Sequence, residues 1–327
     1  MKIILLSGMA AFFLTVLSGF TVIPLLKKLK AGQPVLKYVE THKDKDGTPT
    51  MGGLFFILSA VIIFFVFGGG KAKTAVVAVS FGLAFMAVGF IDDFLKIRFH
   101  KNEGLKAYQK IIFQTAIALV AGFFAYRNRL TEVFIPFCVK SADIGVFIIP
   151  LAFFIFIAIT NSVNLTDGLD GLAGGTTVSY LIFITALSAA EAAAFRFGLL
   201  TVEEYESMFL LSACLIGALC GFLIFNVSRA KVFMGDSGSL SLGGFLGAIS
   251  IFTGNSLFIP IIGFAFVMSS LSVIIQVLHY KRTHRRVFLM APIHHHFQMK
   301  GYSESKIAYF YSALTCILGA LSVIFYI

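Results

Sequence analysis

Long apolar runs recur from one end of this chain to the other, and they decide what it can fold into. A helix needs about 20 apolar residues to cross a hydrocarbon core that is about 30 Å thick. The composition agrees, because 58% of the residues are hydrophobic and only 13% are charged, which excludes an ordinary soluble domain. The pattern predicts an all-α integral membrane protein that forms a single polytopic domain over residues 1–327.

About ten transmembrane helices are expected, and the basic residues between them predict their orientation. Cytoplasmic loops retain Lys and Arg, and 19 of the 26 Lys and Arg residues fall in alternate loops. Both termini are therefore predicted to lie outside. The cytoplasmic loops are about 27–51, 92–110, 161–171, 226–239 and 280–306. The spans are about 3–26, 52–67, 74–91, 111–126, 144–160, 172–190, 207–225, 240–254, 257–279 and 307–326.

Two outer segments are too polar to belong to a span. Residues 127–143 combine Pro136 with β-branched and aromatic residues, which predicts a small hairpin. Residues 191–206 carry several acidic residues at helical spacing, which predicts a short amphipathic helix. By contrast, all seven His and several Asp fall on or beside the cytoplasmic face, so we expect the active site there.

Adjacent acids stand at the inner end of the third predicted span. Asp92 and Asp93 repel each other unless a cation or a proton lies between them, and Lys96 follows Asp92 by one helical turn. A solvated helix end is the alternative interpretation. Lys110 belongs to a basic stretch that either meets lipid phosphates or only sets the topology.

A polar, glycine-rich run follows the fifth predicted span. Asn161, Asn164, Asp167 and Asp170 recur every third residue, so successive members are neighbours on a helical turn. Carboxylates are costly in lipid and should line a watery cavity. Two acids with amide donors are typical of divalent-metal-assisted phosphate chemistry, although a structural polar network is the alternative.

Two further motifs carry residues that suit phosphate and nucleotide binding. Lys45 and Thr50 precede a Gly-Gly helix start, where backbone N–H groups can hold phosphate oxygens; an ordinary helix entry is the alternative. Asn226 precedes a turn in which Asp236 suits a hard cation and Phe233 offers a face for stacking a base. Alternatively, Asp236 or Ser237 caps span eight.

Three consecutive histidines, His294, His295 and His296, lie in the last inner loop, which begins with four cationic residues. They cannot all be ligands on one helix face, and no Glu or Cys is spaced to complete a zinc site. Anion binding or proton transfer to a phosphate is favoured. Gln276, near the inner end of span nine, is expected to point into the same cavity.

Five of these motifs together resemble one known family. They are Lys45-x-Gly-Thr-Pro-Thr-Met-Gly-Gly, Asp92-Asp93-x-x-Lys96, Asn164-x-x-Asp167-Gly-x-Asp170-Gly, Met234-Gly-Asp236-Ser-Gly-Ser and Pro292-x-His294-His-His. In this order and placement they resemble the phospho-N-acetylmuramoyl-pentapeptide-transferases, a branch of the polyprenyl-phosphate N-acetylhexosamine-1-phosphate transferases. The resemblance extends over essentially the whole chain.

The resemblance implies a ten-helix enzyme of the bacterial cytoplasmic (inner) membrane, usually a homodimer, with no nucleic-acid partner. It implies transfer of phospho-MurNAc-pentapeptide from UDP-MurNAc-pentapeptide to undecaprenyl phosphate in membrane lipid. The products are lipid I and UMP, and the cofactor is Mg²⁺.

Site residues follow from the resemblance and from the motifs together. Asp92, Asp93, Asp236 and His294 are the predicted catalytic residues, and Asp236 with the nearby Asp167 is the predicted metal site. The predicted substrate-binding residues are Lys45, Thr50, Lys96, Lys110, Asn164, Asp170, Asn226, Phe233, Gln276, His295 and His296.

Several alternatives stay open. Asp92 or Asp93 either deprotonates or orients the lipid phosphate for direct attack, or a covalent phospho-sugar aspartate forms. A sister transferase that uses UDP-GlcNAc is the nearest rival in substrate. A cation- or proton-coupled transporter would also explain acids beside glycine-broken helices, but it predicts acids near the membrane midplane.

Overall fold

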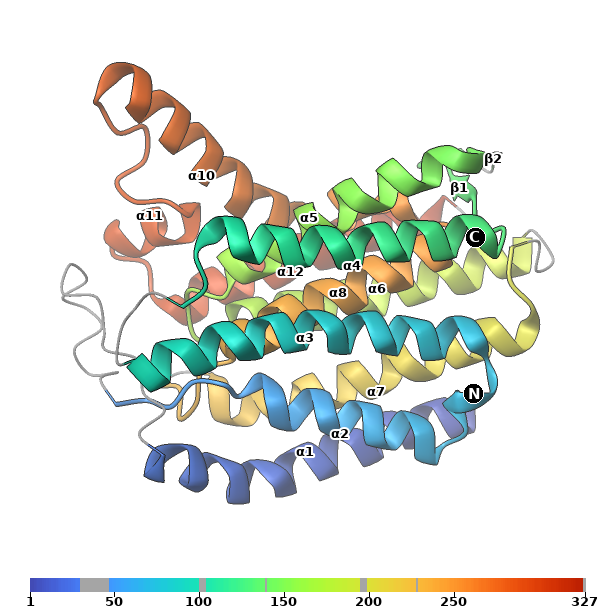
Figure 1. Ribbon diagram of the computed structural model, residues 1–327, viewed down its shortest axis with the longest axis horizontal. Coiled ribbons are helices and arrows are strands. Elements are labelled where there is room, and N and C mark those ends of the chain that lie inside the picture. Colours follow the sequence, from blue (N-terminus) through green and yellow to red (C-terminus); the bar gives the residue numbers. More distant parts are fainter. Residues whose placement is uncertain (30–46, 100–103, 139, 195–198, 228, 326–327) are drawn as a thin grey trace.

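Helices that run side by side make up nearly all of this protein (Figure 1). The computed structural model describes residues 1–29, 47–99, 104–138, 140–194, 199–227 and 229–325. The long helices are α1 (Lys2–Lys28), α3 (Lys73–Phe99), α4 (Ala107–Arg127), α5 (Ile148–Thr166), α6 (Leu172–Ala194), α7 (Val202–Asn226), α8 (Gly235–Phe252), α10 (Phe264–Thr283) and α12 (Glu304–Ile324). Shorter elements are α2 (Gly53–Val66), α9 (Ile259–Ile262), α11 (Ile293–Met299) and the 3₁₀ turns Gly69–Lys71, Gly145–Phe147 and Ser256–Phe258.

Eight of the helices among the described residues are long and apolar enough to cross a membrane. These are α1, α3, α4, α5 (with the 3₁₀ turn before it), α6, α7, α10 and α12. The expectation of an all-helical membrane protein is therefore confirmed. The ninth predicted span, 257–279, is divided into a 3₁₀ turn, α9 and α10, with a break at Gly263.

Helix α8 forms the centre of the bundle. Every residue from Ser237 to Phe252 is buried, so α8 meets protein on all sides and does not need the apolar surface of a lipid-facing helix. Its glycines and serines allow neighbouring helices to come close. A Cβ at Gly89 of α3 would collide with the carbonyl oxygen of Asp236, and one at Gly53 would collide with the backbone of Gly238. Ser241 Oγ also donates a 2.9 Å hydrogen bond to the Gly82 carbonyl of α3.

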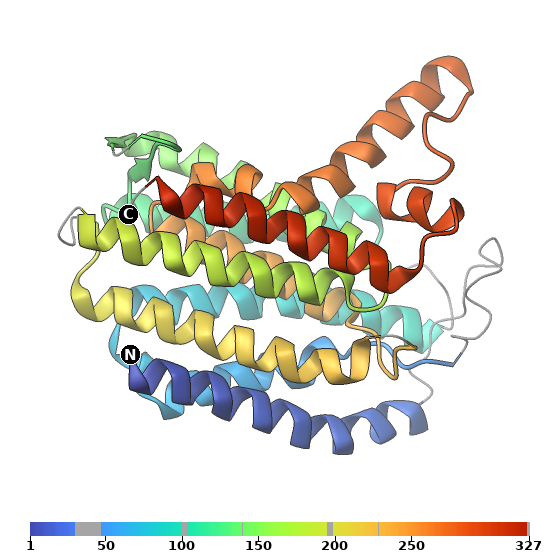
Figure 2. The same ribbon diagram turned by 180° about the vertical axis from the view of Figure 1, so that it is seen from behind.

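The outer helices bury one face and expose the other. Seen from behind, α12, α6, α7 and α1 lie side by side (Figure 2). Helix α1 buries small residues at about every fourth position against α7, as expected for helices that pack in lipid; these are Ser7, Ala11, Thr15 and Gly19. Large apolar side chains cover its exposed face: Leu6, Met9, Phe13, Leu17 and Phe20.

The predicted hairpin is present, whereas the short helix predicted over 191–206 is wrong. Strands β1 (Glu132–Phe134) and β2 (Ser141–Asp143) pair antiparallel, with Glu132 opposite Asp143. In the described parts of 191–206, α6 continues to Ala194 and α7 begins at Val202. Thr201 and Glu204 form a capping box that starts α7. Glu203 and Glu204 therefore belong to the first turn of α7, while Glu191 lies in α6.

Helical structure also extends into four of the predicted inner loops. Helix α3 continues to Phe99 and α5 to Thr166, while α8 already begins at Gly235 and α11 lies within 280–306. Asp92, Asp93 and Asn164 therefore project from regular helices. In both figures α10 leaves the bundle at an angle, with α11 beside it (Figures 1 and 2).

The close approach of α3 to α8 makes a specific prediction for Gly89→Ala. The added methyl would overlap the Asp236 carbonyl oxygen, so the two helices must separate, and such overpacking costs about 1–3 kcal/mol. We expect a lower thermal unfolding temperature in detergent. Gly70→Ala is the matched control. Its Cβ would meet no backbone atom and would lie 3.3 Å from Cδ1 of the Phe65 side chain, which can adjust. Equal unfolding temperatures for the two variants would contradict the packing.

Candidate active site

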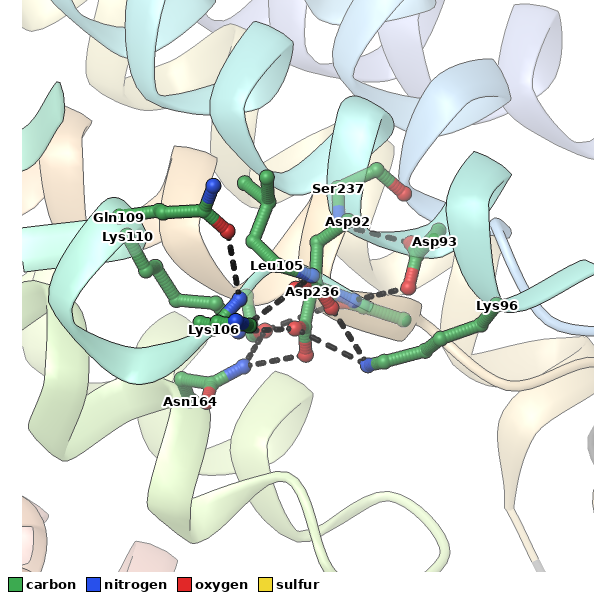
Figure 3. A network of polar contacts seen from close by, with 12 residues as sticks. Asp92, Asp93, Lys96, Leu105, Lys106, Gln109, Lys110, Asn164, Asp236 and Ser237 are labelled. Atoms are coloured by element: carbon green, nitrogen blue, oxygen red, sulfur yellow. Dashed lines mark hydrogen bonds and ion pairs between the residues drawn. The ribbon is translucent and has the colours of Figure 1, made fainter. Parts of the chain in front are cut away.

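Three carboxylates meet where α3 passes the start of α8 (Figure 3). Asp92 and Asp93 come from α3 and Asp236 from the first turn of α8. One oxygen of each lies within 4.8 Å of the others. Asp92 is 1% exposed and Asp93 is fully buried. The missing side chain at Gly89 allows this approach, because a Cβ there would collide with the backbone of Asp236.

Two lysines lie between these carboxylates. Lys96 Nζ contacts Asp92 Oδ2 at 2.6 Å and Asp236 Oδ2 at 3.2 Å. Lys110 Nζ, from α4, contacts Asp92 Oδ1 at 3.2 Å and Asp236 Oδ2 at 2.7 Å. Burying a charge is costly unless an opposite charge and hydrogen bonds compensate for the lost water. Three acids and two lysines still leave one formal negative charge, so this group of five side chains suits a cation.

Asp93 has a different position from its neighbour, because it holds the start of α8. Its Oδ1 accepts from the Asp236 N–H at 3.1 Å and its Oδ2 from the Ser237 N–H at 2.9 Å. The first N–H groups of a helix have no partner within the helix and favour a negative charge. Met234, the residue preceding α8, makes no side-chain cap. The alternative in which Asp236 or Ser237 caps span eight is therefore wrong, since the cap comes from α3.

Asn164 orients the carboxylate of Asp236 from α5. Its Nδ2 donates to Asp236 Oδ1 at 2.7 Å and to Ser239 Oγ at 2.9 Å. Asn161, three residues earlier, instead donates to Gln114 Oε1 of α4 at 2.8 Å. Asn161 and Asn164 are thus three residues apart on α5 but contact different helices, α4 and α8.

Asp167 lies just beyond α5 and outside the group of three carboxylates among the described residues. Burial raises the pKa of this carboxyl well above its usual range, and repulsion from Asp236, Asp93 and Asp170 adds to the shift. A nearby cation would oppose this shift. Its role as a metal ligand stays a prediction.

The turn that joins α5 to α6, residues 167–171, is tied to the segment before α8. Asp170 Oδ2 accepts from the Ala230 N–H at 2.9 Å. Asn226 accepts from the Gly171 N–H at 3.0 Å and donates to the Val232 carbonyl at 3.0 Å. The structure thus brings two predicted substrate-binding residues together as tethers between loops.

The segment that leads into α2 runs beside the same loop. Phe233 N–H donates to the Pro49 carbonyl at 2.8 Å, and the Phe233 carbonyl accepts from Gly52 N–H at 2.9 Å. Thr50 is buried, and a Cβ at Gly235 would lie 2.7 Å from its Oγ1. Thr50 and Phe233 therefore lie next to the start of α8, while Lys45 falls outside the described residues.

The three histidines of α11 occupy unlike surroundings. His294 is fully buried against His295 and Tyr311, and burial, aided by His295, lowers its pKa well below the usual value. His295 Nδ1 lies 3.0 Å from Gln298 Oε1. His296 Nδ1 accepts from the Leu289 N–H at 3.2 Å, so its neutral form carries the proton on Nε2. His294 thus supplies a neutral ring.

Gln276 braces the connection between α10 and α11. Its Oε1 accepts from the N–H groups of Val287 and Phe288 at 3.0 and 2.9 Å, and its Nε2 donates to the Phe288 carbonyl at 3.2 Å. Its predicted contact with substrate stays a prediction.

Comparisons with known proteins agree with these motifs. The sequence model of Glycosyl transferase family 4 matches residues 74–254, and the Phospho-N-acetylmuramoyl-pentapeptide-transferase signature 1 matches residues 45–57. A protein of Clostridium novyi (strain NT) named phospho-N-acetylmuramoyl-pentapeptide-transferase is 42% identical over 330 residues, which cover 99% of this chain and 98% of the relative. A protein of the same name from Desulfitobacterium hafniense is 40% identical and covers 99% and 97%. The chain belongs to the phospho-N-acetylmuramoyl-pentapeptide-transferase family.

Membership makes the chain a transferase, and the two matched regions contain the carboxylate group, whereas Gln276 and the histidines of α11 lie outside them. The span 74–254 includes the carboxylates of α3 and α8, both lysines and Asn164. The family signature, 45–57, includes the segment that lies against Phe233.

Four polar residues that touch the site were missed in the sequence. Ser239 follows Asp236 in its motif and could have been noticed there, whereas the pairing of Gln114 with Asn161 joins distant helices. Gln298 and Glu304 connect α11 to the turn 167–171. The one local signal for Glu304 is its place after Ser303, in a helix-start pattern.

The position of Asp93 predicts a loss of stability in Asp93→Asn. One carboxylate oxygen and its charge are removed from the start of α8, which should lower the free energy of unfolding by about 1–2 kcal/mol. Thermal unfolding of the purified protein measures this. Glu206→Gln, at an exposed position of α7, is the control and should keep the wild-type value. An unchanged Asp93→Asn protein would show that α8 does not need this cap.

Burial of His294 predicts that stability falls in acid. The folded pKa is lowered, so the unfolded chain binds more protons as the pH drops below the ordinary value of about 6.5. The contribution of the neutral His294 ring to the free energy of unfolding should be present above that pH and be lost progressively below it. The groups packed against the ring are His295, Tyr311 and Gly168.

Unfolding temperatures between pH 7.5 and pH 5, a range chosen to bracket about 6.5, test this. His294→Gln should show a shallower decline than the wild type. His284→Gln, at an exposed position that ends α10, should keep the wild-type slope. Equal slopes for all three proteins would refute the buried neutral ring.

Proposed function

We propose that this protein transfers phospho-MurNAc-pentapeptide from UDP-MurNAc-pentapeptide to undecaprenyl phosphate, giving lipid I and UMP in peptidoglycan synthesis. One observation carries the proposal. A chain that matches named relatives along nearly its full length also gathers two buried carboxylates, a third that is partly buried, and two lysines at one place. Phosphoryl transfer depends mainly on positioning and on charge neutralisation, which such a group can supply.

We propose the bacterial cytoplasmic membrane as the setting, with ten spans in one domain, both termini outside and the site facing the cytoplasm. Helices α2 and α8 are added to the eight long apolar helices to give ten. Helix α8 is surrounded by protein, so it can cross the membrane without a lipid-facing surface. The positive-inside pattern of the loops supports this orientation. The two termini lie at the same end of the bundle, away from α11 (Figure 1). A homodimer is the assembly that the resemblance implies.

In the proposed reaction an oxygen of the lipid phosphate attacks the sugar-linked phosphorus of the donor. A new P–O bond forms there, and the bond from this phosphorus to the oxygen of the departing UMP breaks. Asp92 is better suited than Asp93 to orient or deprotonate the lipid phosphate. Both oxygens of Asp93 serve the backbone of α8. Asp92 Oδ1 accepts from the Leu105 N–H at 2.9 Å, but both of its oxygens also contact lysine side chains, which a phosphate could attract.

The carboxylate group fits Mg²⁺, because this ion takes oxygen ligands, usually one or two carboxylates together with substrate phosphates. We propose that Asp236 would hold it, with Asp167 as the second predicted ligand. When bound, the ion would neutralise charge on the diphosphate and on the departing UMP. Asn164 keeps the Asp236 carboxylate oriented, and Lys96 and Lys110 compensate its charge.

UMP release by the purified full-length protein tests the proposal. The assay contains undecaprenyl phosphate, Mg²⁺ and either UDP-MurNAc-pentapeptide or UDP-GlcNAc. We expect release with the muramoyl donor alone, and a loss of about 100-fold or more in Asp236→Asn. Asp143→Asn makes the same change in the outer hairpin and should remain active.

Other outcomes would redirect the assignment. Release with UDP-GlcNAc alone would assign the protein to the sister transferases. Release with neither donor would contradict the proposal, and substrate flux in proteoliposomes would then favour a transporter.

Direct attack predicts that the protein never carries the sugar phosphate. Incubation with a donor labelled in the sugar-linked phosphate, without undecaprenyl phosphate, should leave the protein unlabelled after denaturation. A stable label on Asp92 or Asp93 would replace direct attack by a covalent intermediate.

A further inference from the structure

We propose that Glu304 is a positioning residue, which holds the histidine helix α11 against the turn 167–171 and so shapes the site for the nucleotide donor. This inference rests on the proposed function. Glu304 is the first residue of α12. Its Oε2 accepts from the Asp170 N–H at 3.0 Å, and its Oε1 accepts from Gln298 Nε2 at 3.3 Å. One carboxylate thus joins two elements of the predicted site.

Each of these contacts continues into residues predicted to bind substrate. On one side, Asp170 extends to the Ala230 N–H, in the segment that precedes Phe233 and Asp236. On the other side, Gln298 lies 3.0 Å from His295 Nδ1. Glu304 therefore lies between the histidines and the loop that leads to the carboxylate group.

The two elements also fit closely against each other. A Cβ built at Gly168 would lie 2.5 Å from His294 Nε2 and 3.0 Å from His295 Nε2. The absent side chain lets both rings approach the turn. A small shift of α11 would therefore change where His295 and His296 stand relative to Asp167.

Helix α11 needs such an anchor because it has only seven residues. Isolated helices shorter than about 12–15 residues are marginal in water, so contacts with other elements must hold this one. Its connections toward α10 are the Ile293 N–H to Ser272 Oγ, at 2.9 Å, and the bracing by Gln276. Ile293 and Phe297 of α11 also pack on an apolar cluster that contains Leu169 of the turn and Tyr311 of α12. Because apolar packing is non-directional and α10 leaves the bundle (Figure 2), the hydrogen bonds of Glu304 fix the orientation of α11 relative to the turn.

A simpler role for Glu304 would be to stabilise the start of α12, since a negative charge is favourable at a helix N-terminus. Ser303 already caps this helix by accepting from the Lys306 N–H at 3.4 Å. Glu203 offers a matched control, because it is an acidic residue in the first turn of α7. Glu203→Gln makes the same chemical change without a bridge to the histidines.

Exchanging the carboxylate of Glu304 with the amide of Gln298 tests whether the hydrogen bonds of Glu304 matter, or only its negative charge. In Glu304→Gln, the new amide has one accepting oxygen for two donors, so one contact is lost. In Gln298→Glu, two carboxylates face each other. In the double variant, the amide introduced at position 304 can donate to the carboxylate introduced at position 298 and still accept from the Asp170 N–H. The bridge therefore re-forms in reverse.

Steady-state UMP release is the first readout. For Glu304→Gln we expect the KM for UDP-MurNAc-pentapeptide to rise about tenfold, as for the loss of one charge-assisted hydrogen bond. The KM for undecaprenyl phosphate should stay within about twofold. The double variant should recover most of the donor KM, and Glu203→Gln should match the wild type.

Hydrogen–deuterium exchange of the full-length protein is the second readout and requires no activity. Glu304→Gln should increase exchange in both 293–299 and 167–171, and the double variant should reverse this. If the wild type releases no UMP from either donor, the proposed function fails while exchange still tests the bridge. Unchanged exchange and donor KM in Glu304→Gln would overturn the inference. The inference would also be overturned if Glu304→Gln lowered kcat and the unfolding temperature, left the donor KM unchanged and was not rescued in the double variant.

Discussion

The pairing of buried charges at the junction of α3, α4 and α8 is the constraint on which the rest of the structure depends. Asp92 and Asp93 are withdrawn from water, and Asp236 is largely so, at a site that α8 reaches only because glycines replace larger residues. Removing charges from water is costly unless opposite charges and hydrogen bonds compensate them. Lys96 and Lys110 supply those charges from two different helices. The bundle must therefore hold three helices in register at this point.

The two neighbouring aspartates of α3 make different contacts. Asp93 points to the backbone of α8 and fixes where that helix begins, which in turn fixes Asp236. Asp92 points to lysines, which are flexible and can exchange a carboxylate for a phosphate. Adjacent residues thus make different contacts because successive side chains leave a helix in different directions.

Around this centre, short polar contacts join loops that are distant in the sequence. The turn 167–171 meets the segment before α8 through Asp170 and Asn226, and meets α11 and α12 through Glu304. The segment before α2 pairs its backbone with Phe233. These tethers join segments of several motifs that are far apart in the sequence.

The sequence by itself determined the class of the fold, the approximate positions of most helices and the hairpin, and it singled out the three carboxylates and two lysines that the structure brings together. Hydrophobic length and charge asymmetry are local quantities, and costly polar residues beside apolar runs are visible without coordinates. Only the tertiary structure decided that Asp93 caps α8, that Asn161 turns to Gln114, that His294 is buried, and that 202–206 start α7. Each of these depends on which distant group offers a hydrogen bond or excludes water, and no local pattern records that.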